Sequence, residues 1–390
     1  MKQLFLFLGL ALCTLVAPAQ VQDLSQKATI SILTVDPGTS LNDAFGHSAF
    51  RVRDTTGLDL VFDYGRYPFN DPNFYLNFAR GKLTYSMGGS YYPDFYTSYS
   101  QANRGILEQV LNLTQKEKQA LYQYLLNNYK PKNREYQYDF FYDNCATKIK
   151  DVLLVNCSKP VTFHLPKAYR EATFRELIQQ NLEWNSWGSL GIDIALGSII
   201  DKPAPAEDHM FLPANIARFF EAATLGNNKP LVKNSQRLYK KKTSVKTPKS
   251  FLSPLLSLGL LSLIILVVTY RDYKTKQRSR WLDGILFGLT GCIGVFLLLL
   301  WFATDHTATG YNYNLLWAVP LNLIAWFPLL KTTVKPWVRN YLKLLVILLC
   351  LLVFHWISGV QGFAPALSPL LIALACRYVF LIQKLKHIKT

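Results

Sequence analysis

Long stretches without a charged residue occupy the last third of this 390-residue chain. The first, from Phe251 to Tyr270, has 20 such residues, enough for a helix to cross ~30 Å of hydrocarbon at about 1.5 Å per residue. The longest, from Leu344 to Cys376, has 33 residues and is too long for one crossing, and a turn signal at Gly359–Pro365 divides it. Two further apolar stretches lie between these, one of them interrupted by two prolines. The pattern predicts an all-α transmembrane domain over 251–390 with five helices, at about 251–270, 283–303, 313–330, 341–358 and 364–383.

The basic residues are concentrated beside these apolar stretches. The chain has 42 Lys and Arg against 25 Asp and Glu, a formal net charge of +17. Residues 251–390 hold 13 basic and 3 acidic residues and the linker 237–250 adds six basic residues, whereas residues 20–236 are neutral, with 22 of each sign. A neutral globular portion offers no electrostatic footprint for a phosphate backbone, so we expect no nucleic acid among the partners.

The N-terminus predicts export of the portion that follows it. Lys2, an apolar run from Leu4 to Val16 and the small residues before position 20 form a secretory signal peptide over residues 1–19. In the transmembrane domain, alternate loops and the C-terminus are basic, and the remaining loops carry no basic residue. By the positive-inside rule, the exported domain faces outward and the C-terminus is cytoplasmic. The basic linker would then lie on the outer face, where it can contact lipid headgroups.

The exported domain, residues 20–236, has a mixed α+β pattern. Alternating β-branched residues bounded by turn signals indicate strands, two of them as a hairpin. The capping box formed by Thr114 and Glu117 indicates the start of a helix, and Asp143 or Asn144 can cap another helix that begins at Cys145. Strands are predicted over 28–35, 48–53, 58–64 and 136–142, and helices over 71–81, 114–129 and from 145 onward.

The exported domain contains two cysteines, Cys145 and Cys157. A disulfide between them is one alternative in an oxidising compartment. If residues 145 to about 155 are helical, however, the two Cα atoms are roughly 15 Å or more apart, whereas a disulfide needs about 4.4 to 6.8 Å. We therefore expect Cys157 to be buried and inert. At the first turn of a helix, the macrodipole and unpaired N–H groups favour a nucleophilic thiolate at Cys145 and can stabilise an oxyanion.

A nucleophilic thiol needs a base, and the exported domain offers His47, His164 and His209. His47 follows Gly46 and begins a predicted strand, a rigid position from which an imidazole can be aimed across a cleft. A packing or surface role is the alternative for His47. We expect neither a metal nor a cofactor, because the chain has no His-Glu-x-x-His or paired Cys-x-x-Cys spacing and no nucleotide-binding glycine loop.

Several short motifs resemble those of a bacterial family long known only as a domain of unknown function. They are Gly46-His47-Ser48, Asp63-Tyr64-Gly65, the segment 77–82 and, above all, the segment 138–147 around Asn144-Cys145. That domain resembles circularly permuted papain-like folds, related to NlpC-type peptidases and lecithin-retinol acyltransferase, in which the histidine precedes the cysteine in the chain. With its signal peptide and its five-helix tail, the chain is similar to the Lnb family of lipoprotein N-acyltransferases.

The resemblance implies a bacterial inner-membrane enzyme whose catalytic domain faces the periplasm. Cys145 would be the acyl-accepting nucleophile, His47 its base and Asn144 a supporting residue, and Asp63 is a candidate for the orienting third member, with a turn-capping carboxylate as its alternative. The acyl chain would pass from a phospholipid or other glycerolipid to the α-amino group of a diacylated lipoprotein.

Two other functions remain open from the sequence. A membrane-anchored cysteine peptidase or amidase acting on cell-wall peptides could use the same thiol and imidazole, although such an enzyme does not need five transmembrane helices as an anchor. A non-catalytic envelope assembly factor would use the exported domain to bind a partner and would not depend on Cys145.

Overall fold

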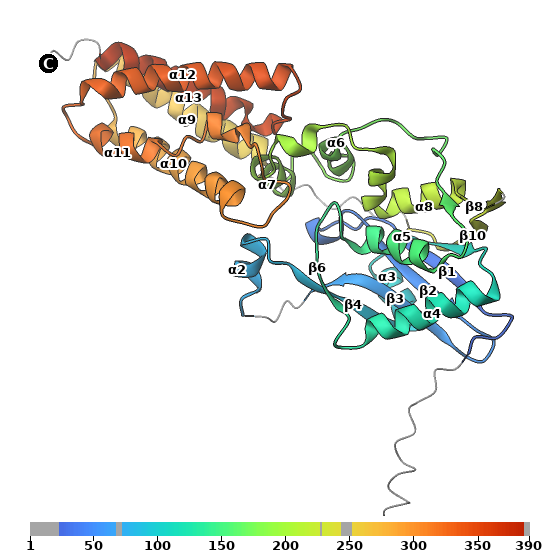
Figure 1. Ribbon diagram of the computed structural model, residues 1–390. Coiled ribbons are helices and arrows are strands. Elements are labelled where there is room, and N and C mark those ends of the chain that lie inside the picture. Colours follow the sequence, from blue (N-terminus) through green and yellow to red (C-terminus); the bar gives the residue numbers. More distant parts are fainter. Residues whose placement is uncertain (1–22, 68–71, 227, 243–251, 386–390) are drawn as a thin grey trace, which may run out of the picture.

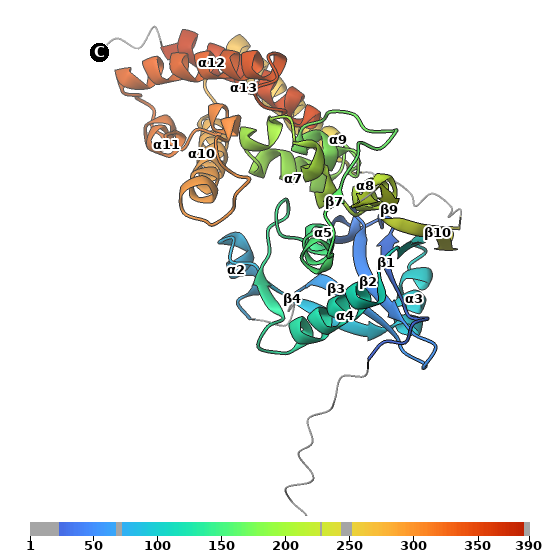
Figure 2. The ribbon, with the colours of Figure 1, turned by 45° about the vertical axis from the view of Figure 1, so that its right-hand side comes forward.

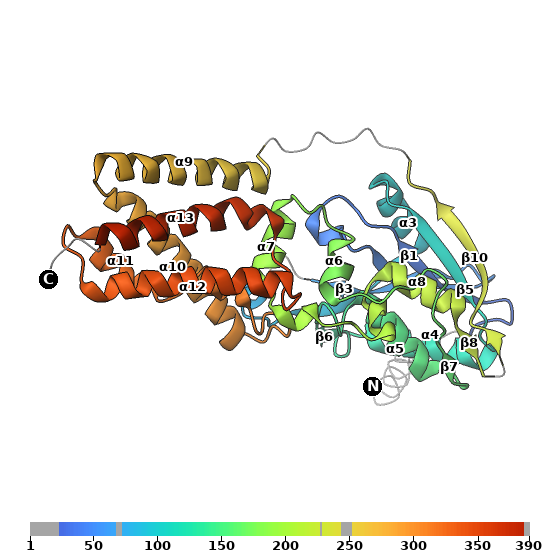
Figure 3. The same cartoon turned by 90° about the horizontal axis from the view of Figure 1, so that it is seen from above.

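A computed structural model describes residues 23–67, 72–226, 228–242 and 252–385 of the chain. The predicted signal peptide, 1–19, and most of the basic linker lie outside these ranges. The exported domain stands at one end of a bundle of long helices, and the short helix α7 (Trp187–Ala195) lies between the two (Figures 1 and 3).

A seven-stranded antiparallel sheet forms the centre of the exported domain. Its order is β10-β5-β1-β2-β3-β4-β6, so the first three strands along the chain are neighbours and later strands extend both edges. The strands are β1 (Thr29–Val35), β2 (His47–Arg53), β3 (Asp59–Arg66), β4 (Thr84–Tyr91), β5 (Ile106–Leu111), β6 (Glu135–Gln137) and β10 (Val232–Tyr239). A second, three-stranded sheet contains β7 (Val161–Thr162), β8 (Thr224–Leu225) and β9 (Lys229–Pro230).

Both faces of the large sheet are covered. Successive side chains of a strand point to opposite faces, and on β1 Ile30 and Ile32 join one core while Leu33 and Val35 join another. The first core includes residues of α4 (Gln115–Tyr129), α5 (Cys145–Asn156) and α8 (Pro213–Ala222). The second includes Phe95 of α3 (Tyr92–Gln101). The mixed α+β fold predicted from the sequence is therefore confirmed.

Local signals explain most of the predicted elements. The strands predicted at 28–35, 48–53 and 58–64 are β1, β2 and β3, within two residues at either end. Thr114 and Glu117 form the expected capping box of α4. The strand predicted over 136–142 ends at Gln137 instead, because the carboxylate of Asp139 accepts the amides of Phe141 and Tyr142 and turns the chain.

The remaining helices of the exported domain connect it to the bundle or cover its core. They are α2 (Phe74–Ala79) and α6 (Phe174–Gln179), with the 3-10 turns η1 (Leu41–Asp43), η2 (Ser198–Asp201) and η3 (Ala206–Phe211). Strand β10 continues to Tyr239, so the first residues of the segment predicted as a basic linker are part of the sheet.

In the described part of the chain, four helices are long and apolar enough to cross a membrane. They are α9 (Pro254–Thr275), α10 (Arg280–Phe302), α12 (Pro336–Ile357) and the continuous segment Pro365–Lys384, which comprises the turn η5 (Pro365–Leu367) and α13 (Ser368–Lys384). Many of their large apolar side chains are exposed, including Leu263, Phe296 and Ile347, as expected for helices that face lipid.

The third of the five predicted membrane helices, 313–330, is not one continuous helix in the structure. This segment consists of the 3-10 turn η4 (Tyr313–Leu316) and the nine-residue helix α11 (Asn322–Leu330), which at about 1.5 Å per residue is too short to cross alone. Pro320 in the break has no N–H for a helical hydrogen bond, and the side chain of Asn314 is engaged outside the bundle, at the carbonyl of Asp193, 3.0 Å away. Arg278, between α9 and α10, donates to the carbonyl of Leu329 at 2.9 Å, so the segment still runs from one end of the bundle to the other.

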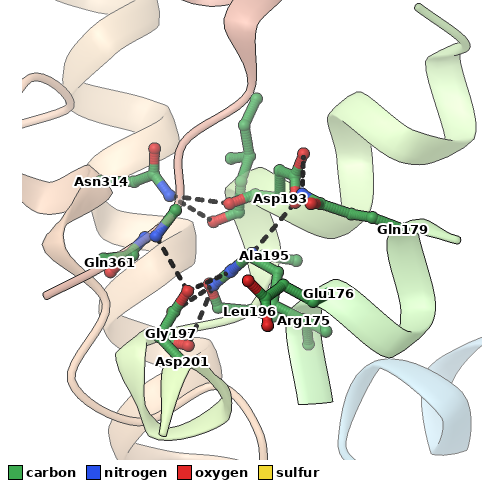
Figure 4. A network of polar contacts seen from close by, with 12 residues as sticks. Arg175, Glu176, Gln179, Asp193, Ala195, Leu196, Gly197, Asp201, Asn314 and Gln361 are labelled. Atoms are coloured by element: carbon green, nitrogen blue, oxygen red, sulfur yellow. Dashed lines mark hydrogen bonds and ion pairs between the residues drawn. The ribbon is translucent and has the colours of Figure 1, made fainter. Parts of the chain in front are cut away.

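A buried polar network joins the two domains (Figure 4). Arg175 of α6 is 3% exposed and pairs with Asp193 at 3.0 Å and with Asp201 at 2.8 Å. Asp201 also accepts the amide of Gly362, which precedes α13, at 2.9 Å. Because these groups are withdrawn from water and pair with one another, the network fixes the exported domain on the end of the bundle.

Candidate active site

His47 is positioned by the glycine before it. Gly46 has a φ of +85°, a conformation that glycine adopts without strain. A Cβ at this position would lie 2.7 Å from the carbonyl oxygen of Val35, the residue that pairs with His47 across β1 and β2. Because Gly46 has no side chain, the chain can turn close to β1 here, and His47 becomes the first residue of β2.

Asp63 lies on β3, beside the strand that carries His47. Its carboxylate contacts His47 Nε2 through Oδ2 at 3.1 Å and accepts a hydrogen bond from Arg66 Nε through Oδ1 at 2.8 Å. The pairing of β3 with β4 is irregular between Asp63 and Arg66, where Gly65 has a φ of +91°. This bulge brings Arg66 back toward Asp63, three residues earlier in the same strand.

Cys145 is the first residue of α5, and Asn144, one of the two predicted caps, is its N-cap. The buried Asn144 side chain accepts the amides of Ala146 and Thr147 through Oδ1 at 2.7 and 3.0 Å. Its Nδ2 donates to the carbonyls of Phe140 and Phe211 at 2.7 and 2.9 Å. Asn144 thus anchors the start of the helix without using the amide of Cys145, which stays available at the positive end of the helix dipole.

The fold brings Cys145, His47 and Asp63 together, although 98 residues separate His47 from Cys145 in the numbering. The imidazole of His47 bonds to Asp63 through Nε2 at 3.1 Å, and the Cys145 side chain lies near enough to raise the pKa of His47. Because Asp63 engages Nε2, Nδ1 is the ring nitrogen left for the thiol. The Cβ of Cys145 also lies 3.7 Å from where a Cβ on Gly65 would stand, which places the thiol beside the end of β3.

Charges in this cluster stabilise one another. Burial disfavours protonation of His47, but the nearby Tyr99 and Cys145 and the hydrogen bond to Asp63 outweigh it, and the pKa of His47 is raised well above its ordinary value. Burial likewise opposes ionisation of Asp63, but His47 and Arg66 outweigh it and lower the pKa of Asp63. The arrangement therefore favours a carboxylate beside an imidazolium.

Aromatic rings surround the thiol and the imidazole. Tyr99 of α3 stacks on His47, with ring centroids 6.1 Å apart, and Tyr138 approaches Gly65 beside Cys145. Tyr138 in turn stacks on Tyr85 of β4 at 4.4 Å. These rings withdraw the reacting groups from bulk water, which strengthens the electrostatic interactions among them.

Sequence reasoning missed Arg66, Tyr85 and Tyr99. The first two come from the β3–β4 pair and the third from α3, and their approach to the site depends on the sheet order, which no local pattern reveals. The positive-φ glycine after Asp63 and Tyr64 is the one local signal for Arg66, since it marks a bulge that can re-aim the next side chain.

The other candidate residues lie outside this cluster. His164 is exposed and pairs with Thr224 Oγ1 at 3.1 Å. His209 is buried against Tyr169, and burial lowers its pKa. Both exported cysteines are free, as predicted. Cys157 is half-buried rather than fully buried, but burial still raises the pKa of its thiol to about 12, so this thiol is unreactive at neutral pH. Among the residues that the structure describes, no three His, Cys, Asp or Glu side chains gather as metal ligands.

Two family models match the chain, and together they cover most of it. The Lnb N-terminal periplasmic domain matches residues 19–180, and the Lnb transmembrane domain matches residues 246–388. No curated protein and no solved structure matches. The matched ranges contain the Cys145 site and all four candidate membrane spans, so this chain is a membrane protein and belongs to the Lnb family.

Proposed function

We propose that this protein is an acyltransferase that moves a fatty acyl chain from a glycerolipid to the N-terminal amine of a lipoprotein. Membership of the Lnb family points to a membrane enzyme that modifies lipoproteins. The single observation that carries the finer proposal is the placement of one imidazole, His47, which bonds to the Asp63 carboxylate and lies beside Cys145 at the start of α5. This is the arrangement of an activated thiol nucleophile with an oriented base.

In the first step, His47 takes the proton of the Cys145 thiol, and the sulfur attacks the carbonyl carbon of an ester in the donor lipid. The oxyanion that forms is stabilised at the first turn of α5, where the Cys145 amide is left free by Asn144. Collapse of this intermediate breaks the ester bond, and the leaving alkoxide takes the proton from His47. The products are a lysolipid and an acyl thioester on Cys145.

In the second step, the α-amino group of the lipid-modified cysteine attacks the thioester carbonyl. His47 takes a proton from the attacking nitrogen, the carbon–sulfur bond breaks to leave an amide, and His47 returns the proton to the departing thiolate. Asp63 contacts no reacting atom in this scheme. It holds the imidazole through Nε2 and stabilises its protonated form.

We also infer a permuted papain-like arrangement for the exported domain. The histidine stands on β2 and precedes in the chain the helix that begins with the cysteine, which is the order expected for that class. The packing of α5 against the face of the sheet that includes Phe50 and Phe62 supports the same assignment.

The orientation of the bundle follows from the same reasoning. Asn312 and Asn314, at one end, donate to carbonyls of the exported domain, whereas the basic residues between α9 and α10 lie at the other. We place the exported domain on the periplasmic face and the C-terminus in the cytoplasm. Both substrates are anchored in the bilayer, so this placement confines their encounter to the membrane surface.

The proposal is tested by mass spectrometry of lipoprotein N-terminal peptides from cells that carry wild-type protein, Cys145→Ala, His47→Ala or no copy of the gene. Acylated amines in the wild type and free amines in the other three are expected. Cys157→Ala is the matched control and should retain acylation, because that thiol is remote and unreactive. Acylated amines in the Cys145→Ala cells would refute the proposal and favour a non-catalytic role, and cleavage of cell-wall peptides by the purified protein would favour a peptidase.

A further inference from the structure

A pocket of about 430 Å³ lies between α2 and β4, next to the Cys145 site. Its floor and walls come from β3, α2, β4 and the start of β6.

The lining combines three cations with several aromatic rings. Arg66, Lys82 and Arg134 face the pocket, and Glu135 is the one acid among the described lining residues, so the pocket carries a net positive charge. Guanidinium and ammonium groups in this combination bind a phosphate through charge-assisted hydrogen bonds. Phe74, Phe78 and Tyr85 provide the apolar surface that the glycerol and acyl carbons of a lipid would need.

Two of the lining residues connect the pocket to the reacting groups. Arg66 donates to Asp63, the partner of His47. Tyr85 stacks on Tyr138, which lies beside the thiol. Arg66 can reach the pocket because it lies across Gly88 of β4, where a Cβ would stand only 1.8 Å from the Arg66 Nε. Contacts through Asp63 and His47, and through Tyr138, therefore connect the pocket lining to the site of the thiol.

The outer wall of the pocket lies at the end of a membrane span. The carbonyl of Phe78 contacts His306 Nε2 at 2.9 Å, and the carbonyl of Arg80 accepts the amide of Asp305 at 2.9 Å. Both partners belong to the loop after α10, and α2 lies near that end of α10 in Figures 1 and 2. Aromatic side chains concentrate at the membrane–water interface, which is the level that this loop occupies.

Helix α2 itself presents apolar side chains in two directions. Phe74 and Phe78, four residues apart, share the helical face that lines the pocket. Tyr75 and Leu76 point elsewhere and are 77% and 57% exposed. Exposed apolar side chains beside the outer end of a membrane span can be buried in the outer leaflet of the bilayer.

We propose that this pocket holds the phosphodiester headgroup of a membrane glycerophospholipid, with Lys82, Arg134 and Arg66 around the phosphate and α2 seated in the headgroup region. The inference rests on the proposed acyltransferase and names its donor. A phospholipid so held carries its ester bonds within a few atoms of the phosphate. The diacylglyceryl group of a lipoprotein has no phosphate to balance the net positive charge of the pocket.

The test compares two donors with the same acyl chains, a phosphatidylethanolamine and a diacylglycerol, in neutral detergent micelles with the full-length protein. The readout is the initial rate of thioester formation on Cys145 as a function of donor concentration. Wild-type protein should prefer the phospholipid, and Lys82→Gln with Arg134→Gln should reduce that preference by about tenfold or more, since each contact contributes a charge-assisted hydrogen bond partly exposed to water. Lys116→Gln, an exposed charge on α4 outside the pocket, should leave the preference unchanged.

Equal use of both donors by the wild type, or an unchanged preference in the double variant, would overturn the proposal. Binding of a fluorescent phosphatidylethanolamine to Cys145→Ala protein separates this proposal from the proposed function, because it needs no chemistry. Binding that weakens about tenfold in the double variant while no thioester forms in the wild type would retain the headgroup site and refute the acyltransferase. Thioester formation in the wild type, with equally weak phospholipid binding whether or not Lys82 and Arg134 are replaced, would support the acyltransferase and refute the headgroup site.

Discussion

Replacement of Asp63 by Asn tests how the site activates its thiol. The carboxylate meets His47 Nε2 at 3.1 Å, and the two side chains are only 9% and 16% exposed, so water screens their interaction weakly. Asn has nearly the same shape, and its amide can still contact the imidazole, but it removes the negative charge. Arg66, the other partner of Asp63, is 45% exposed and can turn to solvent. The substitution therefore changes electrostatics more than packing.

The expected magnitude follows from the contact that is lost. A hydrogen bond to a charged group contributes about 1.5–3 kcal/mol, and each 1.36 kcal/mol of barrier is a factor of ten in rate. If the hydrogen bond from Asp63 stabilises the transition state, in which His47 carries the proton, thioester formation in the variant should slow by about 10- to 150-fold. Loss of the carboxylate should also lower the pKa of His47, because Asp63 is one of the groups that raise it.

The assay is rapid-quench mass spectrometry of the Cys145 peptide after the purified protein is mixed with donor lipid at several pH values. The rate should be slower, and the high-pH limb of the rate profile, where His47 loses its proton, should move to lower pH. Thermal unfolding of the variant serves as a control for folding. A folded Asp63→Asn protein with the wild-type rate and pH profile would show that Asp63 merely caps the turn after β3.

Three further substitutions probe the fold that holds the site. Gly46→Ala should destabilise the exported domain by about 1–3 kcal/mol and slow thioester formation, because its Cβ would meet the Val35 carbonyl oxygen at 2.7 Å; a thermal melt and the same quench assay measure both. Arg175→Met leaves two buried aspartates without their cation, which should cost about 3–5 kcal/mol and be detected as faster proteolysis between the domains. The stabilisation from the raised pKa of His47 is complete below about pH 6.5 and is lost as pH rises through the raised value. Wild-type melting temperature should therefore fall over that range, and a His47→Gln protein should lack this slope.

The parts of the fold that the sequence predicts well are those with local causes. Alternating side chains and turn residues locate β1, β2 and β3, and the Thr114 capping box locates α4. The starts of β2 and α5, which carry His47 and Cys145, have local causes as well, since the glycine before His47 and the Asn144 cap before Cys145 each act within a few residues.

The parts that the sequence does not predict depend on distant partners. The third membrane segment has the composition of a helix but is broken, because Asn314 bonds to a carbonyl more than 100 residues earlier. Arg66 and Tyr99 reach the site only because of a bulge and a strand order that local propensity does not encode. Tertiary contacts decide these positions against the intrinsic preference of the segment.

The central claim is that Cys145 carries the acyl chain, and isolation of that intermediate tests it most directly. Full-length protein incubated with donor lipid alone should gain one acyl mass on the Cys145 peptide, in a bond that hydroxylamine cleaves. A diacylated lipopeptide with a free α-amine should then remove the acyl mass and gain it as an amide. Acylation of the lipopeptide by protein whose Cys145 is never modified, or is replaced by Ala, would contradict the account.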